Sequence, residues 1–361
     1  MPRTFAAAAL AASALTACSS GVVYELDESW VNTKVPPLGN GKILTTNSGD
    51  DSLSWIDAES FAVVFRSPVG LLPPEREGPH HGAVSPDGSA FFVGLSNYIL
   101  GAGSGPRGSY GAGDSDGYLL KYATANAGLI GQTRVDRVPD DVHLTPDGKL
   151  VLVTHFDLKR IQDVVAFGGT IEEMRSTIAL VDPAAMTLSD DDAGLIAKIP
   201  VCPAAHGVAT SADSREAYVA CWGSDELAVV ALSPPYDVEL YRVGPGVLDP
   251  TNPSFQPYAV AVSPTDGTVW LSCLKTGDLR IFDPMTRTWD ARGPIVTGGV
   301  PFFPEFRRDG GQLIVPNQAS NTLSFIEPAT GNITRTLPLP QEACEAPHAI
   351  LFAPDKRHAL V

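Results

Sequence analysis

Side chains with useful chemistry recur at one equivalent position along the 361-residue chain. Six apolar stretches each begin with a Pro or Ala, and the next residue is, in chain order, His80, Asp140, His206, Tyr258, Phe302 and His348. Imidazole is a ligand that copper, zinc and haem iron accept in proteins. One hypothesis is therefore a metal or haem site at His80, His206 and His348. The alternative is that all six are ordinary solvated residues that need no cofactor.

These positions open the copies of an internal repeat. In each copy a first apolar stretch leads to a polar turn and a second apolar stretch; the turns at 85–88 and 145–148 are Ser-Pro-Asp-Gly and Thr-Pro-Asp-Gly. A repeat of this length buries its apolar faces only by stacking on its neighbours. Third and fourth stretches follow in most copies. Four short antiparallel strands in each unit are typical of a β-propeller blade.

The composition agrees with an all-β protein. Charged residues make up only 18% of the chain, which contains 34 Gly and 31 Pro. Seven second strands, near residues 43, 91, 151, 217, 269, 313 and 358, predict seven blades and leave six as the alternative. Since the last of them meets the end of the sequence, we expect either that a strand from 19–40 closes the ring or that a C-terminal part is missing.

Two family resemblances follow from these motifs. The rhythm Pro-x-Gly/Ala-Val-x-x-Ser-Pro-Asp-Gly, together with Ala-Tyr-Val-Ala-Cys at 217–221, resembles the YVTN-type β-propeller repeat family over roughly 41–361. This resemblance implies the fold and a surface location, and little about chemistry. The pairs Pro79-His80 and Pro347-His348 are similar to those of seven-bladed lactonases. Residues 94–97 lack the acidic residue expected of that family, so a lactonase-like hydrolase is the second alternative function.

The N-terminus has the pattern of an export signal. Arg3 precedes an apolar run that ends at Leu15, which is too short to span a bilayer because about 20 residues are needed. The sequence Leu-Thr-Ala-Cys at 15–18 resembles a bacterial lipobox, which implies cleavage before Cys18 and a lipid on its thiol. An ordinary secretory peptide is the alternative.

The lipobox resemblance sets the expected organisation of the chain. We expect a signal peptide at 1–17, a lipidated tether at 18–40 and the propeller at 41–361. The protein would then lie in the cell envelope, anchored to a membrane through the lipid on Cys18. Ser19, in place of Asp, favours the outer membrane or the periplasmic face.

Antiparallel pairing predicts where the reactive side chains gather. The start of an innermost strand and the end of the second strand lie on one face of the disc, so the six positions should surround the mouth of the central channel. His155, Cys221 and Cys273 end second strands on that face. In an oxidising compartment Cys202 and Cys221, which lie in one blade, should form a disulfide. No Cys-x-x-Cys-His occurs, which excludes a covalently attached c-type haem in this stretch.

Charge narrows the choice of partners. The chain has 25 basic and 41 acidic residues, a formal charge of −16, which repels nucleic acid and anionic headgroups. Long insertions at 96–117 and 156–176 add loops to the mouth face. We predict a non-catalytic binding module that takes a protein partner or small ligand there. The first alternative is an envelope redox protein with a metal or haem at the mouth.

Overall fold

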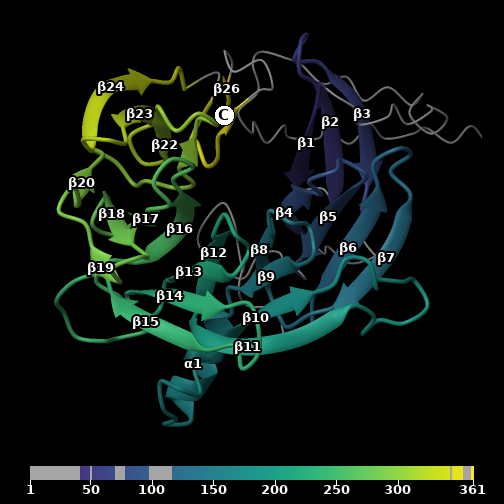
Figure 1. Ribbon diagram of the computed structural model, residues 1–361, viewed down its shortest axis with the longest axis horizontal. Coiled ribbons are helices and arrows are strands. Elements are labelled where there is room, and N and C mark those ends of the chain that lie inside the picture. Colours follow the sequence, from purple (N-terminus) through teal and green to yellow (C-terminus); the bar gives the residue numbers. More distant parts are fainter. Residues whose placement is uncertain (1–40, 49–50, 70–77, 97–115, 342–343, 353–358) are drawn as a thin grey trace, which may run out of the picture.

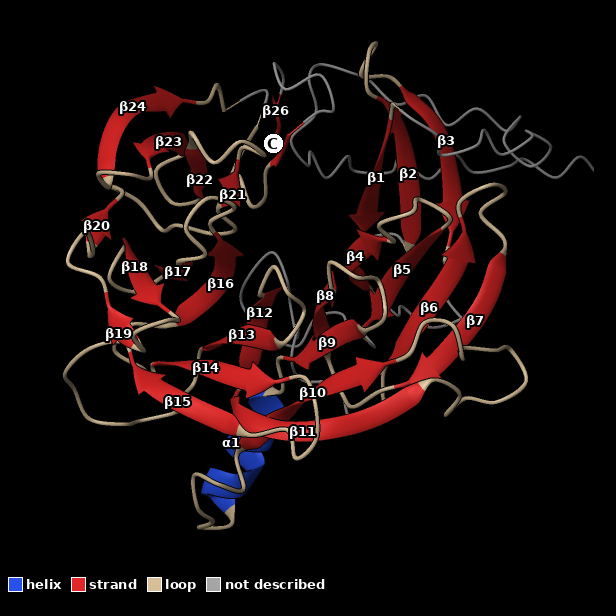
Figure 2. Ribbon diagram, in the orientation of Figure 1, coloured by secondary structure: helices blue, strands red, loops and turns tan. Residues whose placement is uncertain are grey.

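The computed structural model describes residues 41–48, 51–69, 78–96, 116–341, 344–352 and 359–361, in which nearly all regular structure is β (Figure 1 and Figure 2). The single α-helix of these segments, α1 (Leu158–Ala166), follows the second strand of one sheet. Within them we find no helix that is long and apolar enough to cross a membrane. The predicted signal peptide, the lipidation site Cys18 and the tether lie outside the described residues.

The sheets follow one another around a ring in chain order (Figure 1). Four of them contain four antiparallel strands each: β4 (Pro79–Val84), β5 (Ala90–Leu95), β6 (Tyr118–Ala123) and β7 (Leu129–Arg134); β8 (Pro139–Leu144), β9 (Val151–His155), β10 (Arg175–Val181) and β11 (Leu195–Pro203); β12 (Ala205–Thr210), β13 (Glu216–Cys221), β14 (Glu226–Ala231) and β15 (Val238–Arg242); β21 (Glu305–Phe306), β22 (Leu313–Asn317), β23 (Thr322–Glu327) and β24 (Asn332–Pro338).

Three further sheets depart from this plan. They are β1 (Lys42–Asn47), β2 (Ser52–Asp57) and β3 (Val63–Pro68); β16 (Pro257–Val262), β17 (Val269–Cys273), β18 (Asp278–Asp283) and β19 (Thr288–Trp289), with β20 (Ile295–Val296) also paired to β18; and β25 (Leu351–Phe352) with β26 (Ala359–Leu360). The prediction of an all-β propeller with four-stranded blades is confirmed. Among the described residues six sheets have three or more strands, one fewer than the seven blades expected, and the remaining sheet has two.

Apolar side chains fill the space between neighbouring sheets. Phe92 of β5 and Leu119 of β6 belong to one buried cluster with Val142 of β8 and Val153 of β9, and none of the four is more than 4% exposed. Burying a side chain of this size contributes about 1.5–3 kcal/mol. This stacking holds the inner strands of adjacent blades at fixed separations, and it therefore positions the side chains at which those strands begin.

The chain enters five of the repeat copies through the same kink. The residue before the opening Pro or Ala has a φ between 51° and 56° in Gly78, Val138, Ala204, Gln256 and Ala346. A left-handed backbone is costly for residues other than glycine, and most of all for a β-branched residue such as Val138. Strain of this kind persists only where the surrounding fold imposes it, and it is often found at functional sites.

A β-bulge follows the kink in β4, β8, β12 and β16. In β4, Pro79 pairs with Leu95 and Gly82 with Val93, so that His80 and His81 lie opposite the single residue Gly94. Bulges re-aim side chains and are common next to active sites. Here the bulge brings two consecutive residues of an inner strand to the mouth, where simple strand alternation would bring one.

Candidate functional site

The six predicted positions form a closed ring of contacts, which we call the mouth ring. Neighbouring members meet in the order His80–Asp140 (3.1 Å between Nδ1 and Oδ1), Asp140–His206 (2.8 Å between Oδ2 and Nε2), His206–Tyr258 (3.5 Å between ring centroids), Tyr258–Phe302 (4.8 Å), Phe302–His348 (4.5 Å) and His348–His80 (6.4 Å). Six segments far apart in the sequence thus supply one side chain each to a single cluster.

Asp140 is the charged centre of the mouth ring. Its side chain and that of His206 are fully buried, and the His80 side chain is 9% exposed. Burial alone would raise the pKa of Asp140, but the imidazoles of His206 and His80 hold it well below its usual value. Asp140 is therefore an anion, and the second nitrogen of His206, Nδ1, lies 2.9 Å from the carbonyl oxygen of Tyr258.

A second histidine–carboxylate pair lies beside the first. His81 Nδ1 and Asp141 Oδ1 are 2.8 Å apart, and the other oxygen of Asp141 accepts a 2.8 Å hydrogen bond from the backbone N–H of Val208. The His81 ring stacks on that of His80, with centroids 4.4 Å apart and planes 5° from parallel. The pairing of His81 with Asp141 was not predicted, although the doublets His80-His81 and Asp140-Asp141 indicate it once the bulge is known.

The third bulge shows why the doublet is not repeated in every blade. Its second residue is Gly207 of β12, where a Cβ atom would lie 2.7 Å from the carbonyl oxygen of Tyr258 and 2.7 Å from the Cα of Ala259. Any larger residue would collide with the backbone of β16. This blade therefore presents only His206 at the mouth.

Phenylalanine rings surround the imidazoles. The half-buried Phe303 lies with its ring centroid 4.8 Å from that of His81 and 5.3 Å from that of His348. Phe156, the first residue of an insertion, meets His206 edge to face at 4.8 Å. Neither residue was predicted as part of the site. Together they give the mouth an apolar wall that can exclude water and stack on a planar ligand.

The predicted side chains at second-strand ends do not join the cluster as reactive groups. The backbone N–H of Asp136 donates to His155 Nε2 at 3.2 Å, so that Nδ1 carries the proton and donates to the carbonyl of Thr177 at 2.8 Å. Burial also lowers the pKa of His155, which keeps the ring neutral. Cys273 is buried, and burial raises the pKa of its thiol well above the usual value.

The structure joins Cys202 to Cys221, the pair expected from the register of the blade. Their Sγ atoms are bonded and their Cα atoms are 5.8 Å apart. Both residues are fully buried, and Cys221 pairs with Ala205 at the mouth end of β12. The two cysteines lie in neighbouring sheets, Cys202 on β11 and Cys221 on β13, and not in one blade as predicted. The disulfide therefore links these two sheets next to β12, the strand that carries His206.

Three imidazoles could hold a metal ion, and they differ from the predicted three by one residue. One ring nitrogen each of His80, His81 and His348 lies within 4.8 Å of the others. His206 was predicted in place of His81. Its two nitrogens face two acceptors, the carboxylate of Asp140 and the carbonyl oxygen of Tyr258, so neither nitrogen points toward the other imidazoles with a lone pair for a metal ion.

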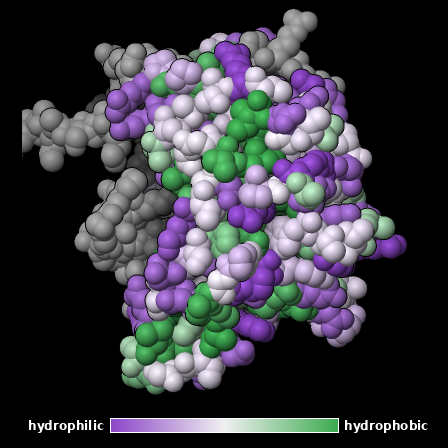
Figure 3. Space-filling view, turned by 90° about the vertical axis from the view of Figure 1, so that its left-hand side faces the viewer, coloured by the Kyte–Doolittle hydropathy of each residue, from purple (hydrophilic) through white to green (hydrophobic). Residues whose placement is uncertain are grey.

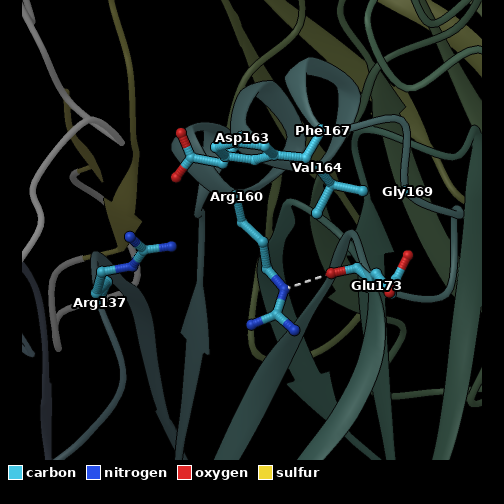
Figure 4. Close-up of a pocket in the computed structure, with 7 residues that line it drawn as sticks. All are labelled: Arg137, Arg160, Asp163, Val164, Phe167, Gly169 and Glu173. Carbon is cyan, nitrogen blue, oxygen red and sulfur yellow. Dashed lines mark hydrogen bonds between the residues drawn. The ribbon is translucent and has the colours of Figure 1, made fainter.

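A separate hollow of about 480 Å³ lies against α1 (Figure 4). Arg160 Nε donates to the carbonyl oxygen of Glu173 at 2.7 Å, and Arg137 pairs at 2.7 Å with Asp157, the residue that caps α1. Phe167, which also lines it, is 90% exposed, and Figure 3 shows hydrophobic surface at the lower end of the molecule, where α1 projects in Figure 1. None of the mouth-ring residues lines this hollow.

Comparison with known proteins identifies the fold alone. No family model and no curated protein matches the sequence, so the YVTN-type resemblance stays a prediction. A functionally unknown protein from Desulfotomaculum acetoxidans is similar with a TM-score of 0.60 and 11% identity, over 89% of this chain and 91% of that one. Hydrazine synthase from Kuenenia stuttgartiensis has a TM-score of 0.60 and 16% identity, over 82% of each chain. The dihydro-heme d1 dehydrogenase NirN in complex with DHE has a TM-score of 0.53 and 15% identity, over 84% of this chain and 56% of that one.

Proposed function

We propose that the protein is a binding module that takes a small ligand or a partner protein at the channel mouth. The mouth ring carries this proposal, because six separate segments converge on one cluster that offers a buried carboxylate, imidazoles and aromatic rings. Such a set can both hydrogen-bond and stack on a ligand. A propeller fold by itself implies no reaction, so the function is argued from this site.

The same proposal includes an anchored protein in the cell envelope. The Leu-Thr-Ala-Cys sequence at 15–18 supports a lipid on Cys18 and a tether over 18–40. The Cys202–Cys221 disulfide supports an oxidising compartment, where such bonds persist. Labelled palmitate fed to producing cells should enter the wild-type protein and not a Cys18→Ala variant.

We also propose seven blades, with β25 and β26 in the seventh. This small sheet lies between the sheet of β21–β24 and that of β1–β3, so it occupies the place of a blade in the ring (Figure 1). The residue that opens its repeat copy, His348, is a full member of the mouth ring. A crystal structure that holds six blades and no seventh would contradict this.

The binding proposal is tested by a thermal-shift screen of a metabolite library. Compounds that stabilise the wild type should lose their effect on Phe303→Ala and His348→Ala, two half-buried members of the mouth. The matched control is Lys149→Ala, because the Lys149 side chain is 80% exposed at the opposite, turn end of β8 and β9. Compounds that still stabilise both mouth variants would bind elsewhere. The same holds for compounds whose stabilising effect is lost equally in Lys149→Ala.

A lactone hydrolase is a second candidate function. The observation that favours it is the pairing of His80 with Asp140 and of His81 with Asp141, since a carboxylate-oriented imidazole can act as a general base. Hydrolysis of a simple lactone should then be lost in His80→Ala. Equal rates in variant and wild type would remove this candidate.

A further inference from the structure

We propose that His80, His81 and His348 bind one transition-metal ion, copper or zinc, at the channel mouth. This inference rests on the proposed function, because it names the ligand of the same site. One nitrogen from each of the three rings lies within 4.8 Å of the other two. Imidazole suits zinc and copper, whereas calcium and magnesium prefer oxygen ligands. The residue types therefore select a transition metal.

Carboxylates orient two of the three imidazoles. Asp140 Oδ1 lies 3.1 Å from His80 Nδ1, and Asp141 Oδ1 lies 2.8 Å from His81 Nδ1. A histidine whose Nδ1–H faces a carboxylate keeps the lone pair on Nε2 for a metal, and metal-binding histidines commonly have such a partner behind them. The Nε2 atoms of His80 and His81 are thus the ligand atoms.

The two carboxylates are themselves held in place. Asp141 accepts a hydrogen bond from the Val208 N–H of the next blade, and Asp140 is clamped on its other side by His206 at 2.8 Å. The hydrogen bond to Asp141 therefore fixes the rotation and tautomer of His81 before any ion arrives, and the carboxylate of Asp140 lies close enough to His80 to restrict that ring. Preorganisation of this kind raises affinity because less freedom is lost on binding.

Coordination needs only a local movement. Three nitrogens at 2.0–2.1 Å from a tetrahedral ion lie about 3.3 Å apart, which is closer than the 4.8 Å limit of this group. His80 and His81 belong to β4, whereas His348 lies outside the strands, where its carbonyl oxygen accepts a hydrogen bond from the N–H of Phe303. The His348 side chain is therefore the one that closes on the ion.

Three protein ligands leave a fourth position of a tetrahedral ion open. The Phe303 ring borders two of the three imidazoles, with its centroid 4.8 Å from that of His81 and 5.3 Å from that of His348. An apolar ring there restricts the fourth ligand to a small molecule. The site is therefore of the open kind that exchanges ligands, and differs from a closed structural site.

The test is a metal titration of tag-free protein that has been stripped with a chelator. Wild type should bind one Zn²⁺ or Cu²⁺ per chain at micromolar concentrations, and bound Cu²⁺ should show nitrogen hyperfine structure in its EPR spectrum. We expect His348→Ala and His81→Ala to weaken binding by at least about 100-fold, and Asp141→Asn by about 10–100-fold. His143→Asn is the matched control, because His143 is an imidazole of β8 outside the group of three.

Two results would overturn the proposal. One is wild-type protein that binds no ion in this range, and the other is an equal loss of affinity in His143→Asn and His348→Ala. Since His348 lies outside the strands, its variant should fold even if His81→Ala does not. The failure of the metal proposal can be told from the failure of the binding proposal. Compounds that stabilise metal-free wild type in the thermal-shift screen, but not Phe303→Ala, would support ligand binding at the mouth even if no metal binds there.

Discussion

The two ends of the inner strands differ in how regularly their residues recur from blade to blade. At the turn end three blades make the same contact. A Ser or Thr hydroxyl donates to the carboxylate of the Asp two residues further along the chain, at 2.6–2.7 Å, in the pairs Ser85–Asp87, Thr145–Asp147 and Ser211–Asp213. At the mouth end the equivalent position holds His, Asp, Tyr or Phe. The repeat keeps the residues that close the turn and varies those that line the mouth.

The carboxylates at the two ends also differ in their exposure to solvent. The turn carboxylates of Asp147 and Asp213 are 39% and 58% exposed, so their hydrogen bonds compete with water. Asp140 at the mouth is fully buried, where an unpaired charge is costly. The same residue type should therefore matter far more at the mouth.

The largest expected effect is that of Asp140→Asn. Removal of one partner of a buried ion pair leaves His206 uncompensated, and we expect a loss of about 3–5 kcal/mol in the free energy of unfolding. The matched substitution at the turn end, Asp147→Asn, should cost about 1 kcal/mol or less. Urea unfolding of both variants measures the contrast, and equal losses would remove the distinction between the two ends.

Opening the Cys202–Cys221 disulfide should have the next largest effect. The two residues are 19 apart in the sequence, and closing a loop of that size stabilises a protein by about 3 kcal/mol. The double variant Cys202→Ser, Cys221→Ser should lose this amount, and reductant should then destabilise the variant less than it destabilises the wild type. A wild type that unfolds at the same urea concentration with and without reductant would show that the bond does not support the mouth.

Between the two ends, Glu305 on β21 should make stability depend on pH. Burial raises the pKa of Glu305 from its usual 4.5 to about 7, and Arg308 offsets part of this effect. The folded state thus favours the protonated acid, so its contribution is present below pH 4.5 and is lost as pH rises through 7. Glu305→Gln should stabilise the protein by about 2 kcal/mol at pH 8, allowing for partial solvent exposure, and by almost nothing at pH 4.

This pH effect is checked by urea unfolding of wild type and Glu305→Gln at the two pH values. A gain of the same size at both would mean that the ionisation of Glu305 is not its cause. Arg308→Ala is the control, because removal of the nearby cation should enlarge the difference between Glu305 and its Gln variant at pH 8.

The smallest effect is expected at the turns. Asp87→Ala removes an oxygen that accepts hydrogen bonds from Ser85 and from the backbone N–H of Ser89, and because this carboxylate is exposed to water the loss of stability should be small. Metabolite hits and metal affinity should not change. A change in either would mean that the turn end takes part in binding.

The fold could be predicted from the sequence because the apolar stretches and the polar turn recur in each repeat copy and mark its strands. The sequence was equally informative about the mouth ring, since residues at one repeat position must meet on a common axis. The pairing of His81 with Asp141 was not predicted because strand alternation places consecutive residues on opposite faces, and only the bulges in β4 and β8 override it. The role of His206 depends on the Tyr258 carbonyl of the next blade, a backbone contact that residue types do not reveal.

The most direct test of the account is a crystal structure of the protein grown with Zn²⁺ or Cu²⁺, with anomalous data collected at the absorption edge of the metal. We predict one strong anomalous peak per chain, about 2.0–2.1 Å from an imidazole nitrogen of each of His80, His81 and His348. A mouth without a peak, or a metal bound only at surface carboxylates such as those of the turns, would contradict it.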